Sequence, residues 1–385
     1  MSIFKKAILF LLCLSSLLLP LSPRASALDT EAPPAVSAQS AILIEATSGR
    51  VIYEKDADRT LPMASTTKIM TALVALENAS PEAVITIDPA AVGTEGSSVY
   101  LSAGERLTLE QLLYALLLES ANDAAVAIAV GVAGSTEAFV ERMNEKAAAL
   151  GLLHTRFENP HGLDHKDHYT TARELSEITR AALENELIKT IVSTRKATIP
   201  HAEAEGGRLL VNHNKLLRMY EGCIGVKTGY TQRSGRCLVS AALREGLTLI
   251  AVTINAPDDW DDHTRMLDYG FSRFHTVTLC ESNALLYPLC VVGGTDAYVM
   301  LANTSEVRAV LPRGSGEIKT RIECRRFEYA NVSKGSVLGR AVFLCDTNGD
   351  GTPEEVGNAP LKALYTVPKK ASKNKFRAWI KSLFD

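Results

Sequence analysis

The first long amphipathic segment of the chain opens with Met63-Ala64-Ser65-Thr66-Thr67-Lys68 and continues over residues 69–74 with apolar side chains at helical spacing. On a helix, residues three apart share a face, so the Lys68 amine is predicted to reach the Ser65 hydroxyl. A serine is a weak nucleophile until a base takes its proton, and a lysine with a lowered pKa can be that base. A helix N-terminus also directs backbone N–H groups at a developing oxyanion. Alone, the motif also fits an N-capped helix with a surface lysine.

A second motif, Ser120-Ala121-Asn122, stands between two apolar runs that are predicted to be helical, residues 107–118 and 124–132. A serine at this point can relay protons between Lys68 and a leaving amine, and an asparagine amide can hold a substrate peptide group. Taken by itself, the motif also fits a polar turn between two helices.

A third motif, Lys227-Thr228-Gly229, enters a strand-rich region. Lysine and threonine on an edge strand can bind a free carboxylate, and Gly229 leaves the backbone open for a substrate to pair as an added strand. The backbone N–H of Tyr230 is expected to complete an oxyanion hole with that of Ser65.

The three motifs follow one another in the order SxxK, SxN, KTG, with 55 residues from Ser65 to Ser120 and 107 from Ser120 to Lys227. This order resembles the signature of penicillin-recognising serine enzymes. Further stretches are similar to the low-molecular-mass penicillin-binding proteins of the D-alanyl-D-alanine carboxypeptidase family. They are Asn159-Pro160-His161-Gly162-Leu163, His168-Tyr169-Thr170-Thr171-Ala172, and Lys227-Thr228-Gly229-Tyr230-Thr231 with Gly235 and Cys237-Leu238. The resemblance covers about residues 38–274.

The resemblance implies an α+β protein. A penicillin-binding/β-lactamase-like catalytic domain, with an antiparallel sheet flanked by helices, is followed by a small all-β domain and a C-terminal amphipathic helix. The implied enzyme is a serine-type D-Ala-D-Ala carboxypeptidase that removes the terminal D-alanine from peptidoglycan pentapeptides and is inhibited by β-lactams. It needs no cofactor and no metal.

The same resemblance implies roles for individual residues. Ser65 is the expected acyl-ester nucleophile, Lys68 the proton acceptor and Ser120 an aid to proton transfer, with Asn122 and Lys227 binding substrate. Some family members carry an arginine for the terminal carboxylate in the stretch that matches residues 212–217. His213 stands in that place here, so carboxylate binding is expected to rest more on Lys227 and Thr228.

The first 27 residues have the composition of an export signal. Lys5 and Lys6 precede an apolar run over 7–21, which is shorter than the roughly 20 residues of a membrane span. Ala25-Ser26-Ala27 then supplies a small-residue cleavage site. A cleaved signal peptide over residues 1–27 is predicted, and an uncleaved anchor is the alternative. The protein is expected to be exported and to lie on the outer face of the cytoplasmic membrane.

Hydrophobic patterning divides the remaining chain. Residues 28–274 are the predicted catalytic domain, with strands expected at 41–46, 50–53, 238–243 and 247–254. Residues 275–365 alternate short Val-rich runs with Gly-containing turns, which predicts a small β-sandwich-like domain.

Residues 366–385 form a predicted basic amphipathic tail. One helical stripe carries its apolar side chains: Phe376, Trp379, Ile380, Leu383 and Phe384. Six Lys and Arg residues in this tail stand against Asp385 alone. The composition favours a membrane anchor, and a terminal helix docked on the β domain is the alternative.

Charge and cysteine content narrow the partners. The chain has a net charge of −3, and the body between signal and tail is acidic, so no nucleic-acid partner is expected. Six cysteines lie outside the signal, at positions 223, 237, 280, 290, 324 and 345. None forms a CxxC pair, which argues against a zinc knuckle. Cys280 and Cys290 are a possible disulfide, and a mainly reduced set is the alternative.

Other interpretations compete with the carboxypeptidase. A class A β-lactamase shares the motifs but uses a glutamate to activate water, and Glu158 lies in about the right region. A non-catalytic peptidoglycan-binding protein is the second rival. His161, Asp164, His165, Asp167 and His168 resemble a metal cluster by composition only. Residues 346–351 open like a calcium loop, but Gly357 stands where a bidentate glutamate is required, so a β-turn is preferred.

Overall fold

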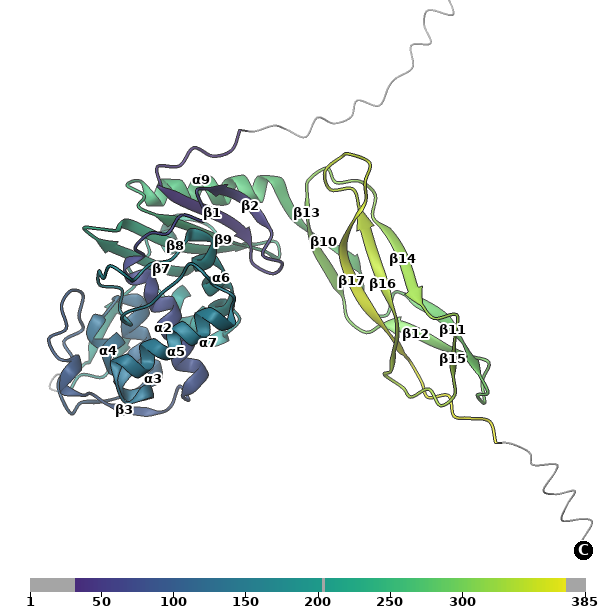
Figure 1. Ribbon diagram of the computed structural model, residues 1–385, viewed down its shortest axis with the longest axis horizontal. Coiled ribbons are helices and arrows are strands. Elements are labelled where there is room, and N and C mark those ends of the chain that lie inside the picture. The colour runs from purple at the N-terminus through teal and green to yellow at the C-terminus, as the bar shows by residue number, and fades with distance from the viewer. Residues whose placement is uncertain (1–31, 203–204, 372–385) are drawn as a thin grey trace, which may run out of the picture. The chain divides into compact units, whose positions relative to one another are not determined.

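The computed structural model describes residues 32–202 and 205–371. Its N-terminal part is built on an antiparallel five-stranded sheet in the order β2-β1-β9-β8-β7 (Figure 1). The strands are β1 (Ser40–Glu45), β2 (Val51–Lys55), β7 (Cys223–Thr231), β8 (Gly235–Arg244) and β9 (Leu247–Ile254). The four expected strands are confirmed, with their limits shifted by at most three residues, and β7 forms an edge of the sheet.

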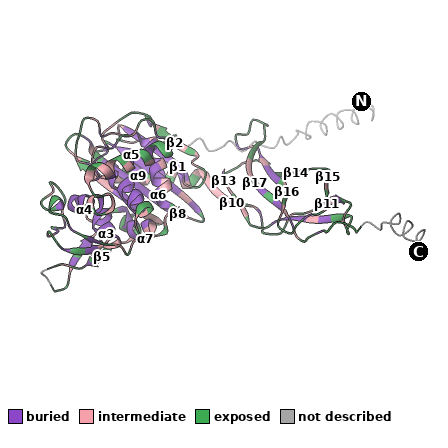
Figure 2. Cartoon of the chain, turned by 60° about the horizontal axis from the view of Figure 1, so that its bottom comes forward, coloured by how far each residue is buried: buried purple, intermediate pink, exposed green. Residues whose placement is uncertain are grey.

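Both faces of this sheet are buried, because its strands carry apolar side chains on both faces. Ile42 and Ile44 of β1 belong to one core, and Ala41 and Leu43 belong to the other. Buried residues accordingly run through the central strands (Figure 2).

Helices cover the two faces unequally. The larger core includes residues of α2 (Lys68–Asn78), α3 (Leu109–Leu118), α4 (Asn122–Ala133), α5 (Thr136–Ala149), α6 (Ala172–Leu183) and α7 (Glu186–Ser193). The other face is covered by α9 (Asp259–Arg273), with the short α8 (Leu216–Met219) beside it. The sheet flanked by helices is therefore confirmed.

The helix expected at 107–118 begins two residues late, at Leu109. Its predicted first turn belongs to β4 (Arg106–Thr108), which pairs with β3 (Val84–Thr86). Thr108 and Gln111 form a capping box, in which each side chain accepts a hydrogen bond from the other residue's backbone N–H. The cap fixes where the helix starts, and hydrophobic periodicity alone does not show this.

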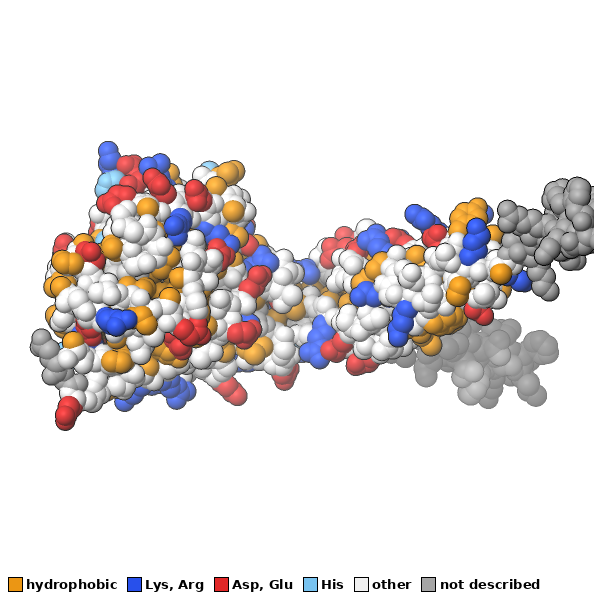
Figure 3. Space-filling view, turned by 90° about the horizontal axis from the view of Figure 1, so that it is seen from below, with side chains coloured by type: hydrophobic (Ala, Val, Ile, Leu, Met, Phe, Trp, Pro, Cys, Tyr) orange, Lys and Arg blue, Asp and Glu red, His pale blue; other side chains and the backbone are white. Residues whose placement is uncertain are grey.

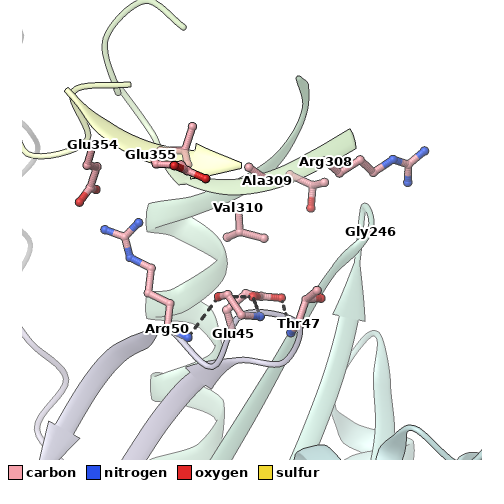
Figure 4. Close-up of a pocket in the computed structure, with 12 residues that line it drawn as sticks. Glu45, Thr47, Arg50, Gly246, Arg308, Ala309, Val310, Glu354 and Glu355 are labelled. Atoms are coloured by element: carbon pink, nitrogen blue, oxygen red, sulfur yellow. Dashed lines mark hydrogen bonds between the residues drawn. The ribbon is translucent and has the colours of Figure 1, made fainter. Parts of the chain in front are cut away.

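Glu45 organises the turn between β1 and β2. Its carboxylate accepts backbone hydrogen bonds from Thr47 at 2.8 Å and Ser48 at 2.6 Å (Figure 4). Ser48 Oγ in turn accepts a hydrogen bond from the Arg50 N–H at 3.2 Å. These bonds compensate the burial of the carboxylate, since Glu45 is only 1% exposed.

From residue 274 to 371, the regular elements of the described chain are all strands, as predicted for residues 275–365. A two-stranded sheet holds β10 (Phe274–Cys280) and β13 (Val307–Pro312). A six-stranded sheet has the order β14-β16-β17-β12-β11-β15. Its strands are β11 (Leu286–Val292), β12 (Tyr298–Asn303), β14 (Lys319–Cys324), β15 (Phe327–Tyr329), β16 (Val337–Cys345) and β17 (Glu354–Ala363). The predicted α+β class is confirmed, whereas the predicted signal peptide and most of the predicted tail lie outside the described residues.

Two smaller predictions are settled by this structure. All six cysteines outside the predicted signal are free thiols, so the Cys280–Cys290 disulfide is not formed. The Asp346 carboxylate accepts hydrogen bonds from the N–H groups of Gly349 and Gly351, which confirms a turn stabilised from within.

Among residues 32–202 and 205–371, no single helix is long and apolar enough to cross a membrane. Together, α4 and α5 have the length and apolar composition of a membrane span, but the chain bends by 86° between them, and only length and composition point to a span.

A buried ion pair fastens the hairpin of β5 (Lys196–Ile199) and β6 (Arg208–Val211) to the rest of the domain. Arg208 Nη1 and Nη2 lie 2.5 and 2.9 Å from the two carboxylate oxygens of Glu105, and these side chains are 7% and 3% exposed. Arg208→Met leaves that carboxylate buried and unpaired, so we expect it to lower the free energy of unfolding by about 3–5 kcal/mol. Urea denaturation at pH 7 measures the change.

The matched control is Lys189→Met, which removes the exposed pair with Glu186. It is expected to change the free energy of unfolding by less than about 1 kcal/mol. Equal losses in the two variants would contradict a special cost of burial.

Candidate active site

Ser65 lies in a turn of 3₁₀-helix, η1 (Ala64–Thr67), immediately before α2. The sequence predicted Ser65 on the first turn of the α-helix. In the structure Ser65 lies instead in the tighter 3₁₀ turn that precedes this helix. Ala64 has a left-handed backbone with φ of 49°, which is unfavourable for a residue with a Cβ. Strain of this kind persists where the surrounding structure enforces it, which makes the turn a candidate functional site.

Lys68 begins α2 and is fully buried. Its Nζ lies 3.0 Å from Ser65 Oγ, 2.6 Å from Asn122 Oδ1 and 2.5 Å from the carbonyl oxygen of His161. Burial, together with the nearby Lys227, holds the pKa of Lys68 well below its ordinary value. The predicted contact between the Lys68 amine and the Ser65 hydroxyl is thus present, at 3.0 Å.

The second motif occupies the break between α3 and α4. Ser120 has a left-handed backbone with φ of 61°, so a second strained residue borders the same site. The Asn122 amide is already engaged, since Oδ1 accepts from Lys68 and Nδ2 donates to the carbonyl of Glu95 at 2.6 Å. The structure thus gives Asn122 a contact with Lys68 that the sequence did not indicate.

The third motif lies on the edge strand β7, as the proposed strand pairing requires. Lys227 is buried, which lowers its pKa to about 7, and its Nζ donates to the carbonyl of Thr228 at 2.9 Å. A Cβ added to Gly229 would lie 3.0 Å from the backbone nitrogen of Ser65. This close approach explains why β7 carries a glycine beside η1, the turn that holds Ser65 and that we call the serine turn.

The three motifs meet at one cleft of about 350 Å³. Of the predicted site residues, five line it: Ser65, Ser120, Thr228, Gly229 and Tyr230. Lys68 and Lys227 lie buried behind its wall, and Lys68 reaches the cleft through Ser65. The remaining lining residues are Ser97, His213, Lys215, Arg236, Asp259 and Trp260.

A family model described as D-alanyl-D-alanine carboxypeptidase, Peptidase_S11, matches residues 27–258. This chain belongs to that family. The D-alanyl-D-alanine carboxypeptidase DacF of Bacillus subtilis (strain 168) is 33% identical over 319 residues, which cover 80% of this chain and 82% of DacF. The resemblance found in the sequence, and the enzyme class of serine-type carboxypeptidases, are thereby confirmed.

Solved structures agree with the family assignment. Penicillin binding protein 5 from Haemophilus influenzae matches with a TM-score of 0.71 and 28% identity, over 88% of this chain and 99% of that chain. The D-alanyl-D-alanine carboxypeptidase DacD from Francisella tularensis matches with a TM-score of 0.63 and 25% identity, over 88% of this chain and 95% of that chain.

Sequence reasoning missed a group at one end of the carboxypeptidase cleft. Arg236 donates to the buried Asp259 at 2.8 Å, and its guanidinium lies 5.7 Å from the ring centre of Trp260. Lys215 Nζ lies 5.9 Å from the same ring. Arg236 of β8 lies opposite Tyr230 of β7, and this register of the two strands brings Arg236 next to the Lys227-Thr228-Gly229 motif. The sequence offers one weak signal, a tryptophan within an acidic helix start.

His213 also lines the cleft of the carboxypeptidase, and its Nε2 lies 3.1 Å from the Glu119 carboxylate. The position is compatible with a role beside the substrate. Glu158, the residue that a β-lactamase interpretation needs, is not among the residues that line the cleft. Its carboxylate instead accepts from Arg156 at 2.7 Å.

The structure separates the histidines that composition had grouped as a metal cluster. His168 is buried and connects Thr67 Oγ1, at 2.8 Å, with the Glu158 N–H, at 3.1 Å. Burial is the main cause that lowers the pKa of His161 to about 3, and the nearby Lys68 adds to it. The His168 ring therefore supports the turn that holds Ser65, whereas His161 contacts Lys68 through its backbone carbonyl. His165 and Asp167 lie instead beside Glu158, with their side-chain ligand atoms within 4.8 Å of one another.

Gly162 packs directly against the strained start of the serine turn. Its φ is +92°, and an added Cβ would lie 2.0 Å from the carbonyl oxygen of Ala64. Gly162→Ala must therefore displace Ser65, and we expect acylation of the serine by a fluorescent penicillin to slow by about 100-fold. Stopped-flow fluorescence measures that rate.

Gly151→Ala is the control, because Gly151 has a similar φ of +75° and nothing within 4 Å of an added Cβ. It carries the backbone strain without the clash. If it slowed acylation equally, the contact between Gly162 and Ala64 would not be the cause.

Proposed function

We propose that this carboxypeptidase removes the terminal D-alanine of peptidoglycan pentapeptides through an acyl-enzyme on Ser65. The observation that carries the proposal is the placement of the buried Lys68 amine, 3.0 Å from Ser65 Oγ. An amine in this position, with a pKa lowered by burial, has the chemistry of a general base.

The contacts of Lys68 fit a neutral amine. Such an amine has two N–H groups and one lone pair, and two of its three neighbours are pure acceptors, Asn122 Oδ1 and the His161 carbonyl. If both N–H groups donate to them, the lone pair is left for the third neighbour, the Ser65 hydroxyl. The hydroxyl then donates its proton to Nζ as Oγ attacks the substrate carbonyl.

The tetrahedral intermediate needs donors on its oxyanion. We infer that the backbone N–H groups of Ser65 and Tyr230 supply them, because Gly229 brings β7 against the serine turn. The exposed edge of β7 lets the substrate pair as an added strand. The C–N bond then breaks, and the terminal D-alanine leaves with a proton delivered by Lys68, aided by Ser120 at the cleft.

Water completes the cycle by attacking the ester carbonyl while Lys68 accepts its proton. The bond between the acyl group and Oγ then breaks, and Lys68 returns the proton to Ser65 Oγ, which restores both groups. A β-lactam presents a cyclic amide to the same nucleophile, so it acylates Ser65, and its tethered leaving group stays in the cleft. This retention slows hydrolysis and explains the expected inhibition. No step requires a metal or a cofactor.

The substrate carboxylate is assigned to the end of the cleft that holds Thr228. The Lys227 amine lies behind it but is buried, with a pKa of about 7, so it carries only part of a charge at neutral pH. Three further groups, Lys215, Arg236 and His213, line the same cleft. We propose that the two cations among them, Lys215 and Arg236, compensate through the electrostatic attraction of a carboxylate.

The predicted signal over residues 1–27 and the basic tail support a proposed location outside the cell, on the outer face of the cytoplasmic membrane. There the enzyme would meet the peptidoglycan peptides that it trims. The tail would then act as the membrane anchor.

Release of D-alanine tests the proposed reaction. Residues 28–385 are incubated with a diacyl peptide ending in Lys-D-Ala-D-Ala, and free D-alanine is quantified. We expect turnover by the unchanged chain and a loss of at least about 1,000-fold in Ser65→Ala, because the nucleophile is removed. Rapid penicillin hydrolysis without D-alanine release would indicate a β-lactamase, and turnover of neither substrate would favour a binding protein.

The pH dependence tests Lys68 as the base. Acylation requires its neutral form, so the rate rises with pH through the pKa of Lys68. The charge on Lys227 helps to lower that pKa. Lys227→Met is therefore expected to raise the pKa of Lys68 and to move the rising limb to higher pH, whatever its effect on the maximal rate.

Lys215→Met removes a cation that is exposed on the cleft rim and is the control. Solvent screens its charge, so the rising limb should stay in place. An unmoved limb in Lys227→Met would contradict electrostatic coupling between the two buried lysines.

A further inference from the structure

One half of the six-stranded sheet presents apolar side chains to solvent. Cys290 of β11 lies opposite Tyr298 of β12 and beside Phe327 of β15, and Val292 pairs with Tyr329. Directly paired residues point to the same face of a sheet, so these five side chains share one face. We call them the aromatic face. The opposite face of the same strands carries core residues such as Leu289 and Val299.

The aromatic face is exposed to an unusual degree. Val292, Tyr298, Phe327 and Tyr329 are 45%, 57%, 43% and 64% exposed. Phe327 and Tyr329 contact each other edge to face, with ring centres 5.3 Å apart. Figure 3 shows hydrophobic side chains interspersed with Lys and Arg on the visible face of the C-terminal domain. A contiguous exposed apolar patch of this kind marks an interaction surface.

Basic residues lie next to the aromatic face at two positions. Arg325 and Arg326 immediately precede Phe327 and are exposed. Exposed Lys369 and Lys370 lie at the opposite side, where the Lys370 N–H donates to the carbonyl of Gly293 at 2.9 Å. Two acids are nearby in the chain. Glu328 accepts a hydrogen bond from Arg325 at 3.2 Å, and Asp296 is exposed.

The described chain ends beside this face. Gly293 directly follows Val292, so the backbone at Lys370 is hydrogen-bonded one residue beyond the aromatic face. The fourteen residues that follow, 372–385, contain four Lys or Arg against one Asp, with a tryptophan and two phenylalanines. The tail therefore leaves the domain next to a surface of the same character as its own sequence.

We propose that the aromatic face is a second membrane-contacting surface, which docks on anionic phospholipid beside the tail. Tyrosine and phenylalanine rings suit the boundary between headgroups and acyl chains, and the surrounding cations suit anionic headgroups. Docking of the tail on this face would bring like charges together, whereas a lipid surface satisfies both. The inference extends the proposed attachment by the tail but rests on separate residues.

Partitioning of residues 28–385 onto vesicles tests the proposal. The vesicles contain phosphatidylglycerol and phosphatidylethanolamine, and bound protein is measured by flotation. Phe327→Ser combined with Tyr329→Ser should weaken partitioning about tenfold. Trp379→Ser combined with Leu383→Ser weakens the tail separately, and the four substitutions together should reduce binding further than either pair.

Leu153→Ser combined with Leu209→Ser is the matched control, because these side chains are 84% and 62% exposed on the catalytic domain. It should leave partitioning unchanged. Unaltered thermal unfolding of the Phe327 and Tyr329 variant shows that its C-terminal domain is folded, and unaltered D-alanine release from a soluble peptide separates this proposal from the proposed catalysis.

Four results would overturn the inference. The first is unchanged partitioning of the Phe327 and Tyr329 variant, and the second is an equal loss in the Leu153 and Leu209 control. The third and fourth concern other occupants of the face in lipid-free solution. Faster hydrogen exchange of β11 and β15 in the tail variant would show that the tail covers the face. A dimer that dissociates in the Phe327 and Tyr329 variant would show that a second copy does.

Discussion

A lysine amine held out of water is the constraint on which the catalytic cleft depends. Burying a charged ammonium is costly, so the environment of Lys68 favours the neutral amine, which is also the form that can accept a proton. Its partners come from three separate parts of the chain: Ser65, Asn122 and the carbonyl of His161. The contacts that compensate the burial of Lys68 are therefore the same contacts that the proposed mechanism uses.

The surrounding fold supplies the rigidity that this arrangement needs. Two residues with a Cβ, Ala64 and Ser120, are held in left-handed conformations at the cleft. Gly162 and Gly229 allow neighbouring segments to approach the serine turn more closely than a side chain permits. A sheet buried on both faces fixes these segments relative to one another. Local strain at the site is thus offset by packing elsewhere.

The two parts of the chain use exposure in opposite ways. In the catalytic domain the amines of Lys68 and Lys227 are buried, and the cleft exposes Ser65 and an edge strand. In the C-terminal domain the apolar rings of Phe327 and Tyr329 are exposed beside exposed cations. Buried amines suit proton transfer, and exposed aromatic rings among cations suit an anionic interface.

The sequence by itself predicted the contact between Lys68 and Ser65 and several strands from local spacing, and the resemblance of its motifs to a known family implied the class of fold. Helical spacing brings Lys68 to Ser65, and alternation predicts the strands β8 and β9. Only the tertiary structure decided that Asn122 holds Lys68, that Arg236 and Trp260 border the cleft, and that the six cysteines in the described part of the chain are unpaired. Those contacts join residues far apart in the chain, and their geometry follows from strand register and packing, which no local pattern records.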